Sequence, residues 1–391
     1  MAQRRQNGTG SISRRKDGSW TGRITLGIGD NGKPKVRAVY GRTESEVRKK
    51  LKELQMDMLS GSPSTIVKQT VRDYMAGWLV NTKQNELKPR SFDRLEQTLE
   101  LYIYPNIGYL QVTALNSDDV QGLINRLRQD GYSFSVIKKV YDAINACFKH
   151  GIAQRKIDFN PAVGVTLPRK DAVPTKSMQY YTTAEMQQIC SAATAETKNG
   201  YRIYRFGDAI VFAANTGLRL AELCGLRWSD IDFEQRNLHV HNTLVMVKNR
   251  DEDQNVHAYK RLEQKSTKSV SGQRVIHLND EAYAALQHMY TITGGEKFVF
   301  TTKHHEAVHP RFFDRLLRKV VTRAGLGEEK QYGMHALRHT FASMLFAAGT
   351  DVKTVSVLLG HADTAITYNT YIHLIDDQAT KAVAKIPSLT K

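Results

Sequence analysis

The octapeptide Thr216-Gly217-Leu218-Arg219-Leu220-Ala221-Glu222-Leu223 places an arginine in a largely apolar run. A guanidinium in such surroundings is costly unless an anion pairs with it, so Arg219 requires an anionic partner. Glu222, three residues on, lies on the same helical side and is the local candidate. A second segment, His335-Ala336-Leu337-Arg338-His339, also contains an arginine, and Arg338 likewise requires an anionic partner.

Two other segments carry chemically informative residues. Lys265-Ser266-Thr267-Lys268 and the following Arg274-Val275-Ile276-His277-Leu278 together predict a hairpin with lysine at its tip. Leu358-Leu359-Gly360-His361 is followed, ten residues later, by Tyr371. Arginine, lysine, histidine and tyrosine thus occur in four separated segments, which points to one site assembled by folding.

The composition excludes several classes of protein. The 391-residue chain has a formal net charge of +17, and its 41% hydrophobic content is ordinary for a folded protein. No stretch approaches about 18 uninterrupted apolar residues, and the polar N-terminus lacks the apolar segment of a secretory signal. The cysteines Cys147, Cys190 and Cys224 are widely spaced, which is typical of reduced thiols. We therefore expect a cytoplasmic protein with no membrane partner.

The positive charge is concentrated near the N-terminus. Residues 1–42 hold ten basic and two acidic residues, so they carry nearly half of the net charge. A compact basic segment favours a polyanionic partner, and in the cytoplasm nucleic acid is the first candidate. A solvated basic face is the simpler alternative.

Hydrophobic periodicity divides the chain into three parts. Residues 10–42 alternate as a three-stranded meander with a hairpin signal at residues 29–32, and a helix capped by Thr43 with Glu46 follows. Residues 67–168 have apolar stripes at helical spacing, which predicts a four-helix bundle. Beyond about residue 175, the patterns predict strands at residues 238–246, 274–278 and 298–301, mixed with helices at 206–215, 310–324, 335–348 and 352–359.

The expected fold class is therefore multidomain α+β. We predict a small three-stranded sheet plus helix in residues 1–62 and a helical bundle in residues 63–170. Residues 171–391 are predicted to form a mixed, mainly helical domain with a small antiparallel sheet. Gly, Ser and Pro residues at 59–64 and a second segment after residue 168 indicate the linkers.

Together, the four segments resemble the tyrosine recombinase (phage integrase) family in content and order. Residues 216–223 are similar to its Thr-Gly-x-Arg-x-x-Glu-Leu box and residues 335–339 to its His-x-Leu-Arg-His box. Residues 358–361 resemble its Leu-Gly-His segment, and Asn369-Thr370-Tyr371-Ile372-His373 resembles its segment containing Tyr-x-His.

The resemblance extends beyond the four segments. Residues 10–60, which begin Gly10-Ser11-Ile12, are similar to the arm-type DNA-binding domain that some integrases carry. Residues 67–168 are similar to the helical core-binding domain, so the third part is the implied catalytic domain. This combination implies an integrase of a prophage or a conjugative transposon, which integrates and excises that mobile element.

The implied activity is site-specific recombination, in which DNA is cut and rejoined through a 3′-phosphotyrosyl intermediate and a Holliday junction. Tyr371 matches the nucleophile, which stores the phosphodiester bond energy so that rejoining needs no ATP. Fixed guanidiniums neutralise the transition-state charge, as metal ions do in other enzymes, so the resemblance implies no metal and no other cofactor. The matches to the family's catalytic residues are Arg219, Lys268, His335, Arg338, His361 and Tyr371.

The resemblance also implies individual roles. Lys268 corresponds to the general acid that protonates the leaving 5′-oxygen, and His335 to a residue that assists proton transfer near the tyrosine. His361 corresponds to a phosphate-binding residue. Glu222 is assigned to orient Arg219, and His339 is assigned a structural role.

Two assignments have rivals. Tyr368 lies three residues before Tyr371, which is preferred because it alone has the Tyr-x-His sequence. Lys265 competes with Lys268, which is favoured by its distance from the strand predicted at residues 274–278.

By resemblance, the partners are double-stranded DNA, at core and arm attachment sites, and further copies of the chain in a homotetramer on DNA. A directionality factor and a host DNA-bending protein are candidate accessory partners, and a nucleoid-associated location follows. Residues 376–391 are expected to pack on a neighbouring protomer, or else to cap their own domain. The residues expected to bind DNA are Arg14, Arg15, Lys16, Arg23, Lys35, Arg37, Lys88, Arg90, Lys138 and Lys139.

The sequence disfavours three rival interpretations of function. His305-Glu306-Ala307-Val308-His309 spells the motif of zinc proteases, but Pro310 disfavours the helix that the motif requires. A chromosome-dimer resolvase or a type IB topoisomerase shares the implied active site, but the basic N-terminal segment and the match along the chain favour an integrase. A DNA-binding regulator with a decayed site is disfavoured because every implied catalytic residue is present.

Overall fold

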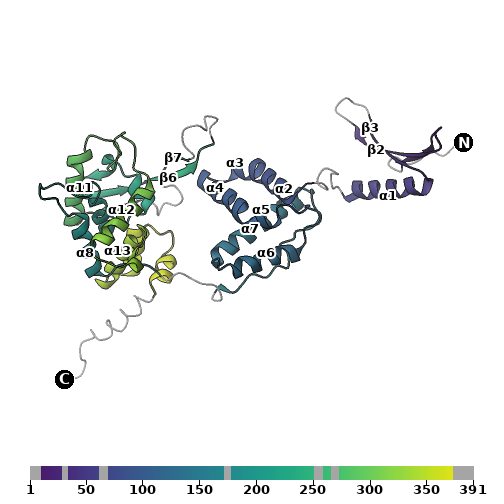
Figure 1. Ribbon diagram of the computed structural model, residues 1–391. Helices are drawn as coiled ribbons and strands as arrows, with labels where there is room; N and C mark the ends of the chain where they lie inside the picture. The colour runs from purple at the N-terminus through teal and green to yellow at the C-terminus, as the bar shows by residue number, and fades with distance from the viewer. Residues whose placement is uncertain are drawn as a thin grey trace, which may run out of the picture. The chain divides into compact units, whose positions relative to one another are not determined.

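The computed structural model describes residues 10–28, 34–60, 69–170, 178–250, 259–265 and 273–372 (Figure 1). The chain divides into two compact units, Met1–Thr175 and Lys176–Lys391. No helix within the described ranges is long and apolar enough to cross a bilayer. The hairpin signal at residues 29–32, the linker residues 61–64 and the C-terminal residues 376–391 lie outside these ranges.

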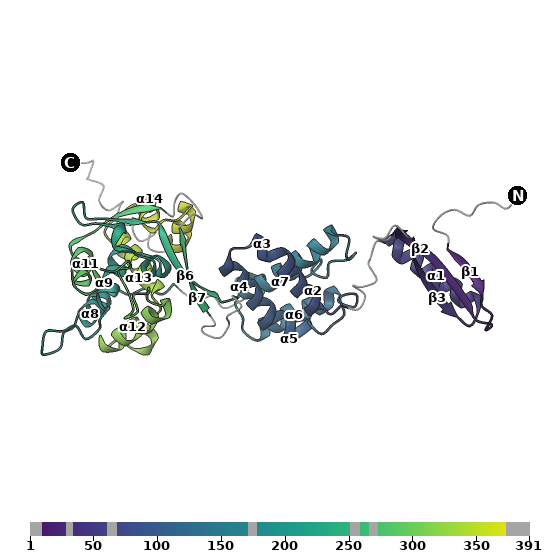
Figure 2. The same ribbon diagram turned by 90° about the horizontal axis from the view of Figure 1, so that it is seen from above.

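The N-terminal part is an antiparallel sheet in the order β1-β2-β3, followed by one helix. The helix lies along one face of the sheet, as Figure 2 shows, and it contacts Ile24 through Val47 and Leu51. Gly22 permits this close approach, because a Cβ there would lie 2.3 Å from Leu51 Cδ1. The elements are β1 (Ser11–Arg14), β2 (Trp20–Ile28), β3 (Pro34–Gly41) and α1 (Glu44–Ser60).

The predicted helix cap is present at the start of α1. The backbone N–H of Glu46 donates to Thr43 Oγ1 at 3.2 Å, and the Glu46 carboxylate accepts from the backbone N–H of Arg42. Two amides at the helix start are thereby satisfied, which confirms the signal read from the sequence.

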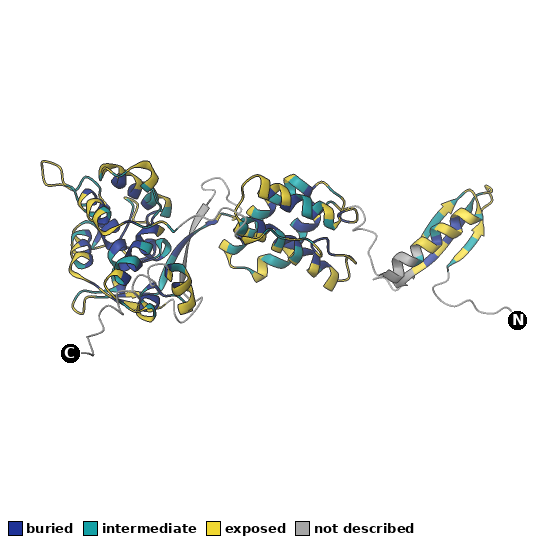
Figure 3. Cartoon of the chain, turned by 90° about the horizontal axis from the view of Figure 1, so that it is seen from below, coloured by how far each residue is buried: buried dark blue, intermediate teal, exposed yellow. Residues whose placement is uncertain are grey.

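The second part is a helical bundle whose predicted apolar stripes form its core. Val71, Met75, Leu123, Ile137 and Ile144 are all fully or almost fully buried. Figure 3 shows the buried residues on the inner faces of the helices and the exposed residues on the outside. The helices are α2 (Val71–Trp78), α3 (Gln84–Glu86), α4 (Pro89–Thr98), α5 (Tyr104–Ile107), α6 (Ser117–Gln129) and α7 (Phe134–Ala153), with π-helical turns at Leu79–Lys83 and Leu99–Ile103.

The unit Lys176–Lys391 combines helices with two small antiparallel sheets, ordered β4-β5-β8 and β6-β7. Its helices are α8 (Thr183–Ala193), α9 (Asp208–Thr216), α10 (Leu220–Cys224), α11 (Asp280–Thr293), α12 (Pro310–Arg323), α13 (His335–Ala347) and α14 (Val352–Leu359), and residues 364–372 are also helical. Its strands are β4 (Ile231–Asp232), β5 (Asn237–Val240), β6 (Asn242–Lys248), β7 (Tyr259–Lys265) and β8 (Arg274–His277).

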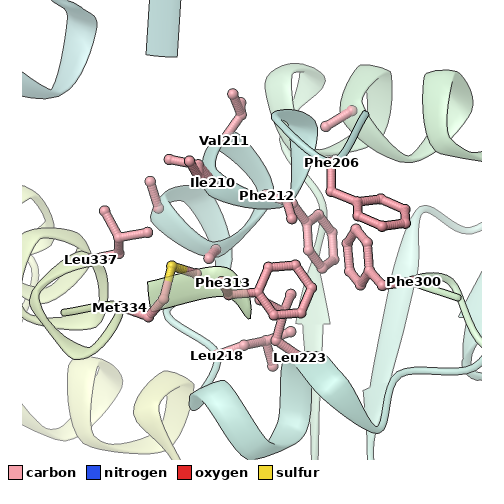
Figure 4. Packing of buried hydrophobic residues seen from close by; sticks show 14 of the residues in the cluster. Phe206, Ile210, Val211, Phe212, Leu218, Leu223, Phe300, Phe313, Met334 and Leu337 are labelled. Carbon is pink, nitrogen blue, oxygen red and sulfur yellow. The ribbon is translucent and has the colours of Figure 1, made fainter. Parts of the chain in front are cut away.

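The core of this unit forms around α9, which is apolar on nearly every side and almost completely buried. Figure 4 shows Phe206, Phe212, Phe300 and Phe313 gathered on one side of this helix. The ring of Phe313 lies 5.4 Å from that of Phe300 and 5.6 Å from that of Phe312, both in edge-to-face geometry, which favours aromatic pairs.

Three strand predictions were wrong. Among the described strands, the hairpin predicted from residues 265–268 and 274–278 does not form, because β7 pairs with β6 whereas β8 pairs with β5 in the other sheet. The single strand expected at residues 238–246 is two strands, because β5 pairs with β4 and β8 whereas β6 pairs with β7. Residues 298–301 form isolated bridges, Phe298 with Arg227 and Thr301 with Ala307, and no continuous ladder. An apolar run predicts burial, but it does not specify which segment the run will pair with.

The zinc-protease motif is excluded by its backbone, as predicted. His305 has a φ of 61°, outside the helical region, and Ala307 pairs with Thr301 in a bridge. His309 precedes α12 and accepts from the backbone N–H of Arg311 through Nδ1. The two histidines therefore do not share a helix face.

We predict that Phe313→Ala lowers the free energy of unfolding of this unit by about 3–5 kcal/mol, the usual cost of removing a buried aromatic ring. Phe313 is completely buried, so the substitution leaves a cavity among the neighbouring phenylalanines. Denaturant unfolding of the full chain would measure the change. Tyr201→Ala, at a side chain that is 73% exposed, is the matched control and should change stability by less than about 0.5 kcal/mol. Equal effects of the two substitutions would contradict the packing described here.

Candidate active site

Arg219 stands at a tight turn between α9 and α10. The turn requires Gly217, which has a φ of 61° and whose Cβ, if present, would lie 2.4 Å from Phe341 Cδ1. Arg219 precedes α10 and donates to Glu222 twice, from the backbone N–H at 2.9 Å and from Nη1 at 2.8 Å. The pairing of Arg219 with Glu222 expected from their spacing is confirmed.

Arg274 at the start of β8 is a residue of the site that the sequence analysis did not single out. Its side chain is buried and donates to both carboxylate oxygens of Glu222, at 3.2 and 3.0 Å. Its Nε also donates to the carbonyl of Leu358 at 2.7 Å. The sequence did contain a signal for this residue. The alternation of a strand that turns Ile276 inward also turns Arg274 inward, and a buried arginine needs an anionic or hydrogen-bonding partner.

Arg338 on α13 is 3% exposed and links two distant turns of the chain. It donates from Nη1 to the carbonyl of Gly217 at 2.9 Å and from Nη2 to the carbonyl of Leu359 at 2.6 Å. Burial and the nearby positive charge of Arg219 lower its pKa to about 9. The protein therefore holds a guanidinium where its charge is disfavoured. An anion bound beside it would relieve this, so the arrangement is typical of an anion-binding site.

The carboxyl end of α14 joins the three arginines. Three consecutive carbonyls accept from them: Leu358 from Arg274, Leu359 from Arg338, and Gly360 from Arg219 at 2.9 Å. These are carbonyls at a helix end, where the backbone lacks intrahelical donors and carries partial negative charge. Gly360 closes the helix in the left-handed conformation, with a φ of 64°.

His361 and His335 lie beside the arginines. His361 directly follows the helix end and contacts Thr367 Oγ1 through Nδ1 at 2.7 Å. Burial and the charges of Arg338 and Arg219 lower the pKa of His361 to about 4. His335 begins α13 at the solvent boundary, and partial desolvation with the same two charges lowers its pKa. Both imidazoles are therefore neutral near pH 7 when no anion is bound.

Tyr371 is 1% exposed and lies among α13 side chains. Its hydroxyl is 2.8 Å from His339 Nδ1, and its ring packs 5.5 Å from that of Phe346. Burial raises the pKa of the phenol to about 12, against an opposing effect of Arg338. The rival Tyr368 is 44% exposed on the same helical segment.

The structure thus brings together five of the six residues matched to the family's catalytic set: Arg219, His335, Arg338, His361 and Tyr371. Lys268 lies outside the described residues. For its rival Lys265, the structure describes only the backbone, at the end of β7.

The predicted DNA-binding residues lie on the two N-terminal parts and, where their side chains are described, all are exposed: Arg14, Arg15, Lys16, Arg23, Arg37, Lys88, Arg90, Lys138 and Lys139. The side chain of Lys35 is outside the description. The guanidinium of Arg15 lies 5.1 Å from the ring centre of Tyr40. Strand register pairs Arg23 with Ala38 on the face away from α1, whereas Arg14 pairs with Trp20, which packs on the helix side.

The fold and this cluster define the class of protein. Residues 179–378 match the phage integrase family and residues 71–166 match the phage integrase central domain. The chain belongs to the phage integrase family and is a tyrosine-type site-specific DNA recombinase.

Relatives extend this likeness along the chain. It is 29% identical to a tyrosine recombinase XerC-like protein of Caldanaerobacter subterraneus, over 94% of this chain and 95% of the relative. It is 24% identical to the transposase of transposon Tn916 from Enterococcus faecalis, over 99% of this chain and 97% of the relative. Among solved structures, the Tn1549 transposon integrase in complex with transposon right end DNA is similar at 26% identity and a TM-score of 0.62, over 82% of this chain and 100% of the other.

We predict that Glu222→Gln lowers the free energy of unfolding of this unit by about 3–5 kcal/mol near pH 7, because two arginines then face a neutral amide. Burial alone would raise the pKa of Glu222, but the hydrogen bonds and charges of Arg274 and Arg219 outweigh it and lower the pKa. The carboxylate therefore contributes stability above its ordinary pKa, and this contribution is lost as the pH falls through the lowered value.

Denaturant unfolding between pH 3 and pH 7 tests this prediction. The stability difference between the natural chain and Glu222→Gln should shrink toward the acid end. Glu234→Gln, at an exposed position, is the control and should leave the curve unchanged. A difference that is constant over the whole range would show that ionisation of Glu222 is not the cause.

Proposed function

We propose that the chain integrates and excises a mobile element by attack of Tyr371 on a DNA backbone phosphate held by Arg219 and Arg338. The convergence of three arginines on the carboxyl end of α14, beside the Tyr371 hydroxyl, carries this proposal. The transposon relatives and the Tn1549 integrase support the assignment to a conjugative transposon or a related element.

Charge explains why this cluster suits a phosphodiester. Glu222 pairs with Arg219 and Arg274, whereas Arg338 is held by neutral carbonyls. The cluster is therefore positive, and an anion between Arg219 and Arg338 relieves their repulsion. Guanidinium forks also match phosphate oxygens geometrically, and because they are fixed in advance they stabilise the additional charge of the transition state.

The remaining roles follow the resemblance. Attack forms a bond between Tyr371 Oη and phosphorus and breaks the bond from phosphorus to the 5′-oxygen, which gives a 3′-phosphotyrosyl link. Lys268 protonates the leaving oxygen, His361 contacts the phosphate, and His335 assists proton transfer. Arg274 acts as a positioning residue, because it holds Glu222, which in turn holds Arg219.

The partner is double-stranded DNA. The exposed basic residues of the N-terminal sheet serve arm sites, and those of the bundle, Lys88, Arg90, Lys138 and Lys139, serve the core site. Each chain supplies one Tyr371, and the exchange of both strands between two duplexes takes four cleavages, so four copies assemble through a Holliday junction. Such a complex acts at the nucleoid, with a directionality factor and a DNA-bending protein as candidate accessory partners.

Tyr371→Phe is expected to bind DNA normally and to form no covalent adduct, because the nucleophilic oxygen is absent. The measurement uses a nicked duplex covering the ends of the element, incubated with protein in EDTA, and scores an SDS-resistant, protease-sensitive adduct. Tyr368→Phe is the matched control and should form the adduct at the natural rate. An adduct that persists in Tyr371→Phe and disappears in Tyr368→Phe would reverse the assignment, and tight binding without any adduct would favour a DNA-binding regulator.

Arg338→Lys is expected to slow adduct formation by about 10²–10³-fold, the usual effect of removing one transition-state donor. Lysine keeps the positive charge but lacks the planar fork of arginine. It therefore cannot contact the carbonyls of Gly217 and Leu359 and a phosphate oxygen at the same time. Single-turnover cleavage rates measure the change, and thermal unfolding checks that the variant is folded. A rate within about threefold of the natural one would show that the fork of Arg338 does not serve the phosphate.

A further inference from the structure

The contact between His339 and Tyr371 stands apart from the roles assigned above. His339 Nδ1 is 2.8 Å from the Tyr371 hydroxyl, so this imidazole directly touches the proposed reacting atom. His335, which the resemblance assigns to proton transfer, instead packs edge-to-face on His339 at 4.7 Å between ring centres. We propose that His339 is the general base that takes the Tyr371 proton during strand cleavage, an inference that rests on the recombinase function proposed above.

Geometry supports acceptance of a proton by His339. His335 and His339 lie one turn apart on α13, and the His335 ring limits how the His339 ring can turn. The ring centres of His339 and Tyr371 are 5.7 Å apart at an interplanar angle of 60°, which brings Nδ1 to the phenolic oxygen. A proton acceptor must lie within hydrogen-bond reach of the proton it removes, and this pair meets that condition.

The electrostatics of the pair also suit proton transfer. Burial raises the pKa of Tyr371 to about 12, so the phenol keeps its proton near pH 7 and needs a base at the moment of attack. Burial, with His335 and Arg338, lowers the pKa of His339 to about 4, so its ring is neutral and offers an unprotonated nitrogen. A phosphate at Arg338 offsets part of that repulsion, and His339 becomes more basic when substrate is bound.

The step balances in atoms and charge. Tyr371 Oη forms a bond to phosphorus as its proton passes to His339 Nδ1, and the bond from phosphorus to the 5′-oxygen breaks. The leaving 5′-oxygen takes a proton from the general acid, assigned above to Lys268. In rejoining, the 5′-hydroxyl attacks phosphorus and returns its proton to Lys268. The bond from phosphorus to Tyr371 Oη breaks, and His339 returns its proton to the phenolate.

Two substitutions separate proton transfer from simple positioning. His339→Asn can keep a hydrogen bond to the Tyr371 hydroxyl, but an amide does not accept a proton near pH 7. His339→Phe removes both functions. We expect both variants to form the covalent adduct at least 100-fold more slowly than the natural chain on the nicked duplex. His304→Asn, at an exposed histidine in a turn, is the matched control and should react at the natural rate.

A duplex with sulfur in place of the bridging 5′-oxygen identifies the proton that His339 moves. A thiolate leaves without protonation, so this duplex should restore the rate of Lys268→Ala but not that of His339→Asn. Restoration of both variants would assign His339 to the leaving group and overturn the proposal. A rate for His339→Asn within threefold of the natural rate, on the unmodified duplex, would reduce His339 to a positioning residue and also overturn it.

The pH dependence gives a readout that a purely structural role would not change. The groups facing His339 are His335 and Arg338 on its own helix and Tyr371 and His361 from the segment after α14. Cleavage by the natural chain should fall as the pH drops through the pKa of His339, and His339→Asn should lose that inflection. An unchanged inflection in His339→Asn would overturn the proposal.

Controls separate the possible failures. Thermal unfolding and DNA binding of each variant must equal those of the natural chain. If the natural chain forms an adduct that depends on Tyr371 and the His339 variants react equally fast, the recombinase function stands and the base assignment fails. If the natural chain forms no adduct that depends on Tyr371, both proposals fail together.

Discussion

Three consecutive carbonyls at the carboxyl end of α14 are the constraint on which the site depends. Leu358, Leu359 and Gly360 each accept a hydrogen bond from a different arginine. These arginines come from β8, α13 and the turn before α10, which are far apart in sequence. A helix end concentrates partial negative charge and unsatisfied acceptors. It can therefore bind several guanidiniums and leave their positive charge intact, whereas carboxylates would neutralise it.

This arrangement leaves the cluster positive before any DNA is bound. Glu222 satisfies Arg219 and Arg274 together, and a buried carboxylate between two guanidiniums fixes their geometry at a cost in desolvation. The desolvation cost is largest for Arg338, because both burial and the charge of Arg219 disfavour its protonated form. Part of the folding free energy is therefore used to hold these donors in place. In the proposed reaction they would need no rearrangement when transition-state charge appears.

Burial keeps the Tyr371 phenol in its neutral form, whereas the arginines of the cluster remain charged. It is buried against Phe346 and His339, in surroundings that favour its neutral form. In the proposed reaction, this phenol stays protonated until a phosphate and a base are both in place, and the nearby arginines then favour its ionised form. Under the proposals made above, α13 supplies both the positive charge for the phosphate, at Arg338, and the acceptor for the phenolic proton, at His339.

The sequence by itself determined the local features: the amphipathic helices of the bundle, the cap at Thr43 and the pair of Arg219 with Glu222. Each rests on spacing within about one helical turn, which a linear pattern records. Only the tertiary structure decided that Arg274 joins Glu222, that the run at 238–246 divides between two sheets, and that His339 meets Tyr371. The two side-chain contacts join residues 32 or more positions apart, and no periodicity specifies which distant groups will meet when the core packs.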